Sequence, residues 1–164
     1  MAHDDQPDRG EAFRDLHVRG RPFVLPNAYD VGSARMLAGL GAQAVATTSA
    51  GFAFTLGRRD GARVTRDQML DHAEDMVRAV AVPVSADLEN GYADDPDGVA
   101  ETVELAAEVG LVGCTIEDLT YDTRKPAYDF DIALARIEAA VEAAEALPFP
   151  FTLTARADGV MAGA

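Results

Sequence analysis

Two carboxylates spaced two residues apart are the side chains of this chain best suited to chemistry. Asp87 and Glu89 end a stretch, 82–89, in which apolar and polar residues alternate as they do in a β-strand. Side chains two apart share a strand face, so both carboxylates point one way, about 6–7 Å apart along the backbone. Buried carboxylates this close need a cation or protons to neutralise them. The spacing favours a divalent-metal site over the alternative, a solvated acidic strand end.

A third acid and an arginine stand at the ends of later predicted strands. Glu117 follows the strand predicted over 111–116, and Arg156 follows the one predicted over 149–155. If these strands are neighbours, Glu117 converges with Asp87 and Glu89, and hard oxygen ligands of this kind suit Mg²⁺ or Mn²⁺ with waters completing an octahedron. Arg156 is the only cation at a predicted inward strand position, where it can hold a substrate carboxylate bidentately or pair with an acid. We favour the substrate carboxylate.

Other residues of types that often carry chemistry give weaker signals. Asp60 lies in a glycine-rich loop, where it is either functional or a plain turn aspartate. Cys114 faces the helices by strand alternation, which predicts buried packing. The three histidines lie in the N-terminal tail or on predicted helices, so a Ser–His–Asp arrangement is excluded.

Composition excludes several classes of partner. With 28 acidic and 14 basic residues the chain has a net charge of −14, which argues against nucleic acid or an anionic membrane. No apolar run reaches the length of a membrane span, and residues 1–10 do not resemble a signal peptide, so we expect a cytoplasmic protein. A single cysteine excludes an internal disulfide and a multi-cysteine zinc site.

The elements that must position these residues alternate between strand and helix. The sequence predicts strands over 21–26, 42–48, 82–89, 111–116 and 149–155, and helices over 31–40, 65–80, 96–109 and 132–147, with a short opening helix at 12–19 and no clear period over 49–64. Such alternation indicates an α/β fold with a parallel sheet. Functional-looking residues just past successive strand ends are typical of a (β/α)₈ TIM barrel, and no nucleotide-binding glycine fingerprint follows the first strand.

A full barrel normally needs about 250 residues, so the chain is predicted to hold only about the first five of eight strands. We expect a flexible tail over 1–12 and a partial barrel domain over 13–164.

Six short segments, in this order, resemble the isocitrate lyase/phosphoenolpyruvate mutase superfamily, most of all its carboxyvinyl-carboxyphosphonate phosphorylmutase-like branch. They are PNAYD (26–30), TTSAG (47–51), LGRRDG (56–61), ADLENGY (86–92), IED (116–118) and ARAD (155–158). Each segment alone is weak, but six in order are specific. The resemblance implies a TIM barrel of the phosphoenolpyruvate mutase type and an enzyme that makes or breaks a C–C or P–C bond beside a 2-oxo acid through an enolate.

The resemblance also implies a metal cofactor, Mg²⁺ or Mn²⁺. Asp87 and Glu89 would serve the metal, and Glu117 would help through water. Asp87 would also contact the substrate. A metal and an arginine together supply the positive charge that enolate formation requires.

For the substrate, a small anionic 2-oxo acid, the resemblance implies a second group of residues. The backbone around Thr48, Ser49 and Ala50 would cradle the oxo-acid carboxylate, and Arg156 would pair with that carboxylate or with the transferred group. Asp60 would contact the reacting end, as nucleophile or positioning group. Asp60, Glu117 and Arg156 are therefore the expected catalytic residues.

The chain departs from the family in one segment. Lyase branches carry a Lys-Arg-Cys-Gly-His type segment after the fourth strand, whereas residues 119–126 here read LTYDTRKP. The missing cysteine argues against isocitrate or methylisocitrate cleavage, and the mutase branch's asparagine is missing as well.

Family members run on through three further strands and an exchanged helix, which would complete the pocket, and we expect a homo-oligomer in the full-length form. The alternatives are a non-catalytic fragment and a class II pyruvate aldolase.

Overall fold

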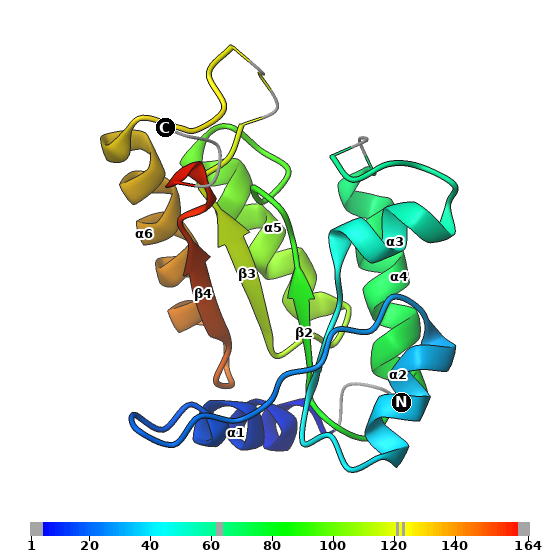
Figure 1. Ribbon diagram of the computed structural model, residues 1–164. Coiled ribbons are helices and arrows are strands. Elements are labelled where there is room, and N and C mark those ends of the chain that lie inside the picture. Colours follow the sequence, from blue (N-terminus) through cyan, green and yellow to red (C-terminus); the bar gives the residue numbers. More distant parts are fainter. Residues whose placement is uncertain (1–4, 62–63, 121, 123, 161–164) are drawn as a thin grey trace.

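A single parallel sheet organises the part of the chain that the computed structural model describes, residues 5–61, 64–120, 122 and 124–160. Its strands follow the order of the chain (Figure 1): β1 (Val45–Ala46), β2 (Val84–Asp87), β3 (Gly113–Glu117) and β4 (Thr152–Arg156). Helices connect successive strands, which confirms the predicted α/β fold with a parallel sheet. The register sets Asp87 beside Thr115 and Glu117 beside Arg156, so the functional side chains meet at one edge.

The strand predicted over 21–26 is wrong. Only an isolated bridge between Asn27 and Ala46 joins this segment to the sheet, with the Ala28 N–H donating to the Ala46 carbonyl (2.7 Å). Prolines at positions 22 and 26 have no N–H to donate to a ladder, and Val24 is 82% exposed. The described chain therefore has four strands instead of the five expected.

Four long helices follow the predicted pattern and cover one face of the sheet (Figure 1). They are α2 (Val31–Gly39), α4 (Arg66–Ala79), α5 (Pro96–Glu108) and α6 (Phe130–Ala146). The capping box predicted for α4 is present, because Thr65 accepts from the Gln68 N–H and the Gln68 side chain accepts from the Thr65 N–H. Apolar side chains of α4 and α5 pack with β2 and β3 in one core. Within the described ranges, no helix is long and apolar enough to cross a membrane.

The N-terminal segment is a helix where we expected a flexible tail. Helix α1 spans Gln6–Leu16 and lies across the end of the sheet at which the strands begin (Figure 1). Gln6 is buried, and its amide donates to the carbonyls of Ala107 (2.7 Å) and Leu111 (2.9 Å). These hydrogen bonds fix a polar segment that has no apolar stripe of its own. Residues 1–4 of the expected tail and 161–164 of the expected barrel domain lie outside the described residues.

A short helix, α3 (Ser49–Thr55), occupies the start of the segment for which we predicted no regular structure. Thr48 caps it by accepting from the Gly51 N–H. Because α3 begins directly after β1, it places Ser49 at the same sheet edge as Asp87. A 3₁₀ turn, η1 (Asp158–Val160), follows β4 in the same way.

Candidate active site

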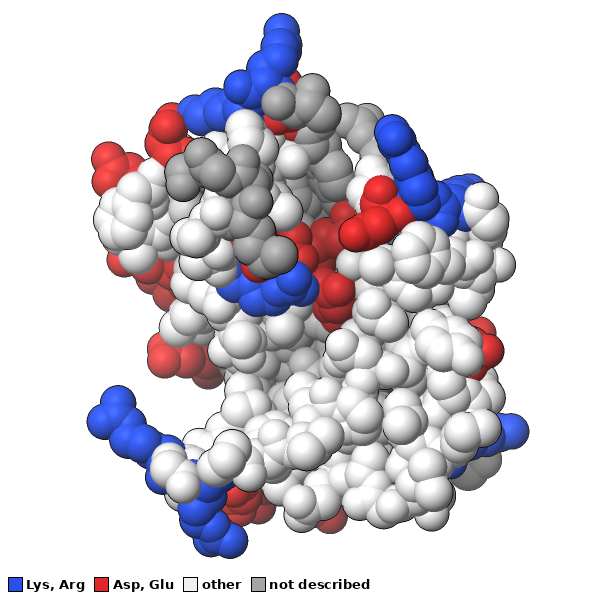
Figure 2. Space-filling view, in the orientation of Figure 1, with Lys and Arg blue, Asp and Glu red and all other residues white. Residues whose placement is uncertain are grey.

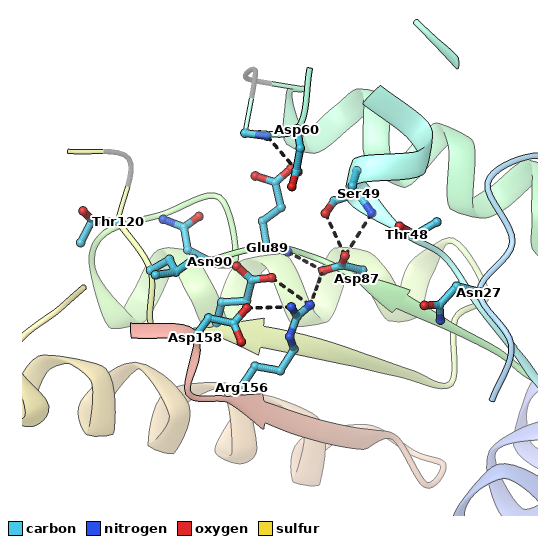
Figure 3. A pocket seen from close by; sticks show the side chains of 14 residues that line it. Asn27, Thr48, Ser49, Asp60, Asp87, Glu89, Asn90, Thr120, Arg156 and Asp158 are labelled. Carbon is cyan, nitrogen blue, oxygen red and sulfur yellow. Dashed lines mark hydrogen bonds and ion pairs between the residues drawn. The ribbon is translucent and has the colours of Figure 1, made fainter. Parts of the chain in front are cut away.

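A cavity of about 630 Å³ opens at the carboxyl ends of the strands, and every residue predicted to act in catalysis, substrate binding or metal binding lines it (Figure 3). Its lining residues are Asn27, Thr48, Ser49, Ala50, Asp60, Gly61, Asp87, Glu89, Asn90, Glu117, Leu119, Thr120, Arg156 and Asp158. Asp87, Glu117 and Arg156 are the last residues of β2, β3 and β4. Asn27 precedes β1, and the other lining residues lie in the segments that follow the four strands. The structure thus brings the predicted residues together, while their individual roles stay predictions.

Asp87, the last residue of β2, is fixed by hydrogen bonds on both carboxylate oxygens. Its Oδ2 accepts from the Ser49 N–H (3.0 Å) and from the Ser49 hydroxyl (2.8 Å). Its Oδ1 accepts from Thr115 Oγ1 (3.4 Å) and from the Glu89 N–H (3.3 Å). We expected the Ser49 N–H to cradle a substrate carboxylate, and here it donates to Asp87 instead.

Arg156, the last residue of β4, lies among three carboxylates. Its Nη1 contacts Glu117 (2.9 Å) and Asp87 (3.3 Å), and its Nη2 contacts Asp158 (2.7 Å). Both uses considered for this arginine are therefore open to it, since it pairs with acids and also faces the cavity (Figure 3). Its guanidinium is the positive charge at the centre of the acidic group.

Glu117 ends β3 in a poorly solvated position. Burial raises the pKa of its carboxyl to about 7, Arg156 opposes the rise, and the negative charges of Asp87, Asp158 and Glu89 add to it. The Arg156 ion pair therefore compensates only part of the cost of burying this acid. A carboxyl group with such a pKa holds or releases a proton close to neutral pH.

Glu89 lies just past β2 in a backbone conformation that is rare for its residue type. Its φ is +49°, in the left-handed region, and Tyr92 in the same loop has φ +57°. The Glu89 carbonyl accepts from the Glu117 N–H (2.8 Å), which anchors the loop to β3. In Figure 3 its side chain extends away from Arg156, toward the side of the cavity where Asp60 lies.

Asp60 lies in the loop after α3 and is exposed. Its Oδ1 accepts from the Gly61 N–H (2.9 Å), the contact expected of a turn aspartate. Gly57 and Gly61 flank it with positive φ angles of 68° and 67°. The structure therefore combines the two readings of Asp60, because it is a turn residue that lines the cavity.

The carboxylate oxygens of the cavity are ligands of the kind that a hard divalent cation prefers, although they are not arranged around one position. Five carboxylates line the cavity, and oxygen donors of this kind are preferred by Mg²⁺ and Mn²⁺. They belong to Asp60, Asp87, Glu89, Glu117 and Asp158. The pKa of Glu117 is raised mainly by burial, and the negative charges of Asp87, Asp158 and Glu89 add to the rise. Among the described residues, no three acidic, histidine or cysteine side chains are arranged as a metal site.

Charge on this face is unevenly distributed. Figure 2 shows acidic side chains gathered in the hollow at the middle of the face, with basic side chains beside them, while the lower part of the face is largely uncharged. The hollow therefore combines several negative charges with local positive charge.

Sequence reasoning gave no role to several residues that line the cavity. Asp158 follows Arg156 by two positions, a spacing that could have drawn attention to it, and it lies in η1 just past β4. Asn27 lies in a segment quoted only for family resemblance, and Asn90 directly follows Glu89. Leu119 and Thr120 belong to the loop after β3, where polarity alone gave no signal.

Comparisons with known proteins agree on one family. The family model for phosphoenolpyruvate phosphomutase matches residues 13–164. The crystal structure of a putative lyase/mutase from Burkholderia cenocepacia J2315 is 55% identical with a TM-score of 0.94, covering 98% of this chain and 57% of that one. Oxaloacetate acetylhydrolase, solved with its product oxalate, is 33% identical with a TM-score of 0.80, covering 94% and 55%.

Curated sequences give a similar picture. An oxaloacetate decarboxylase from Marinomonas sp. is 28% identical over 149 residues, 87% of this chain and 52% of that protein. Others are a 2-methylisocitrate lyase of Halalkalibacterium halodurans (27%) and a 2,3-dimethylmalate lyase of Eubacterium barkeri (32%), each matched over 37% of its length. Phosphonopyruvate hydrolase, solved with oxalate and Mg²⁺, is 20% identical (TM-score 0.86, 94% and 54% covered) and shares the fold. The chain spans about half the length of these barrel proteins, or less where the match is shorter.

Proposed function

This chain belongs to the phosphoenolpyruvate mutase/isocitrate lyase superfamily, and on that premise we propose that its cavity binds a small 2-oxo acid together with Mg²⁺ or Mn²⁺. In the whole enzyme the reaction makes or breaks a C–C or P–C bond beside the oxo group through an enolate. Relatives named for oxaloacetate favour C–C chemistry. The observation that carries the proposal is the gathering of Asp87, Glu89, Glu117 and Arg156 around one cavity.

The metal would be held by Asp87 and Glu89, with Glu117 acting through water, and when bound it supplies positive charge to the enolate oxygen. Asp87 is well prepared for this role, because the hydrogen bonds from Ser49 fix its carboxylate before any ligand arrives.

Arg156 would bind the substrate carboxylate through its planar guanidinium. Glu117, beside Arg156, carries a proton on its carboxyl below about pH 7. Above that pH it is charged and forms an ion pair with Arg156. Asp60 lies in the loop after α3 and lines the cavity on the wall opposite Arg156 (Figure 3). It would contact the reacting end of the substrate.

Metal binding tests the proposal. Asp87→Asn removes a charged ligand, so we expect Mn²⁺ affinity measured by titration calorimetry to fall at least about tenfold. Asp97→Asn makes the same change at an exposed position of α5 and serves as the matched control. Unchanged Mn²⁺ affinity in folded Asp87→Asn would rule out the metal assignment.

Turnover assays separate the remaining alternatives. Release of product from oxaloacetate or phosphonopyruvate alone supports the proposed class, whereas activity that requires an added aldehyde indicates a class II pyruvate aldolase. Metal binding without turnover of any 2-oxo acid indicates a non-catalytic role.

A further inference from the structure

Arg136 is a buried cation outside the proposed site. It lies on α6, is 1% exposed and is among the largest fully buried side chains. Burying a charge is costly unless its hydrogen bonds are satisfied. An apolar residue would serve at this position if the only requirement were to pack α6 against its neighbours, so the contacts of the guanidinium indicate what else it does.

Those contacts converge on the loop that follows β2. Nη1 donates to the carbonyls of Ala93 (2.9 Å) and Asp94 (3.3 Å), and Nη2 donates to the carbonyl of Asn90. One side chain on α6 thus binds three backbone carbonyls within residues 90–94. The first of them belongs to the residue directly after Glu89.

This loop needs such support. Glu89 and Tyr92 are both non-glycine residues with positive φ, at 49° and 57°. Each such conformation carries a strain cost and persists only when its surroundings determine it. Because the backbone at Glu89 sets where its carboxylate points, whatever holds the loop also determines how Glu89 is presented.

Tyr128 extends the same contacts to the loop after β3. The Arg136 guanidinium lies over its ring, with Cζ 3.9 Å from the ring centroid. The Tyr128 hydroxyl donates to Asp94 Oδ1 (2.6 Å) and accepts from Asn90 Nδ2 (3.0 Å). The Tyr128 N–H donates to the carbonyl of Asp118 (2.9 Å), the residue after Glu117. The loops that follow Glu89 and Glu117 are therefore tied together through one cluster of hydrogen bonds.

We propose that Arg136 and Tyr128 are positioning residues that hold loop 89–94 in its left-handed conformation and so set the cation affinity of the cavity through Glu89. The inference rests on the proposed function in taking Glu89 as a metal ligand. Neither residue lines the cavity, so neither is expected to touch metal or substrate.

The test uses Arg136→Met, which keeps an unbranched apolar side chain in place of the arginine stem and removes the guanidinium donors. We expect Mn²⁺ affinity to fall about tenfold, and the midpoint of thermal unfolding to fall as well, because three carbonyls lose a buried donor. Hydrogen exchange of the metal-free protein should become faster within 89–94 by a larger factor than elsewhere. Tyr128→Phe keeps the ring under Arg136 and removes only the hydroxyl, so a smaller loss of about threefold is expected. It also preserves the test if Arg136→Met fails to fold.

Arg9→Met is the matched control. Arg9 also donates to backbone carbonyls, those of Val77 (3.3 Å) and Val80 (3.1 Å), but it does so from α1 at the far end of the sheet. We expect wild-type Mn²⁺ affinity and wild-type exchange within 89–94 in this variant.

The outcomes separate the two proposals. If the wild-type protein binds no Mn²⁺, the metal assignment fails, and exchange that rises most within 89–94 in Arg136→Met still supports positioning. If the wild-type protein binds Mn²⁺ and Arg136→Met binds it equally well with unchanged exchange, positioning is overturned. A uniform rise in exchange across the molecule also overturns it, because that result indicates a role in global stability alone.

Discussion

Arg156 and Glu117 form an ion pair in which the acid is the less well compensated partner. They lie side by side on β4 and β3, 2.9 Å apart at their closest atoms. Burial outweighs the attraction of the guanidinium and leaves the pKa of Glu117 near 7. The charged form of Glu117 therefore destabilises the folded state in the absence of a ligand.

Stability should accordingly depend on pH through Glu117. The folded-state pKa of Glu117, about 7, lies above its ordinary value of 4.5. The protonated carboxyl therefore contributes to the stability of the folded state, fully below pH 4.5, and this contribution is lost as the pH rises through 7. We expect metal-free Glu117→Gln to be more stable than wild type at pH 8 by about 1 kcal/mol, allowing for solvent screening, and equal or less stable at pH 4.5. Urea unfolding at the two pH values measures the difference. A constant difference between the proteins would contradict the prediction.

Arg156→Lys tests the carboxylate anchor. Lysine keeps the charge and loses the planar fork, so we expect oxalate affinity in the presence of Mg²⁺ to weaken by about 1–3 kcal/mol. Arg35→Lys, at an exposed position on α2, is the control. Equal oxalate affinity in wild type and Arg156→Lys would place the anchor elsewhere.

At the scale of elements, α1 is the largest difference between expectation and structure. Its first turn is polar, and its attachment depends on Gln6, whose amide binds the two carbonyls at the α5–β3 junction. Its apolar contact is made by Phe13, which packs with Ala44 and Val112 at the same end of the sheet. A buried glutamine has no periodic signature, which is why the sequence suggested a flexible tail.

Removing the Gln6 amide should therefore destabilise the fold. We expect Gln6→Ala to lower the free energy of unfolding by about 1–3 kcal/mol, because two carbonyls lose a buried donor. Glu11→Ala, at an exposed position of the same helix, should change it by less than about 0.5 kcal/mol. Denaturant titrations of both variants compare them directly, and equal stability of the two would show that α1 is not anchored through Gln6.

Elements with a clear period were predictable and those held by contacts were not. Alternation around Asp87 located β2, and the stripe of Met69, Ala73 and Met76 located α4. Helix α3 was missed because its seven residues are too short to show a period, and the cap from Thr48 is what starts it. The segment 21–26 has strand-like residues, but its prolines prevent a ladder.

The site was predictable to a similar degree. Parallel neighbours bring strand ends to one edge, so residues at those ends had to meet. The sequence does not reveal that Ser49 binds Asp87, because this contact depends on where α3 begins. Nor does it reveal that Arg156 contacts three acids at once, because this depends on the strand register and on the 3₁₀ turn that carries Asp158.

At the scale of the whole molecule, β4 is an edge of the described sheet. It pairs with β3 alone, and Thr154 and Ala155 are exposed. A strand edge of this kind presents unpaired N–H and C=O groups that can pair with another chain.

We therefore expect the 164-residue polypeptide, produced by itself, to self-associate through β4. Sedimentation velocity should show a mass that rises with protein concentration. Thr154→Lys places a charge on the edge strand and should shift association to concentrations about tenfold higher. A monomer at all concentrations for the unmodified chain would contradict the prediction.

The surface on which α1 packs determines when this helix can dock during synthesis. Gly10 approaches Pro150 so closely that an added Cβ would lie 2.5 Å from the Pro150 carbonyl oxygen, and Phe13 lies against Gly113. About 140 residues separate Gly10 from Pro150, which corresponds to roughly 7–30 s of translation. Helix α1 therefore leaves the ribosome well before the segment around Pro150 has been made. Through that interval its binding surface, at the amino ends of β3 and β4, is incomplete, and the nascent chain carries α1 undocked.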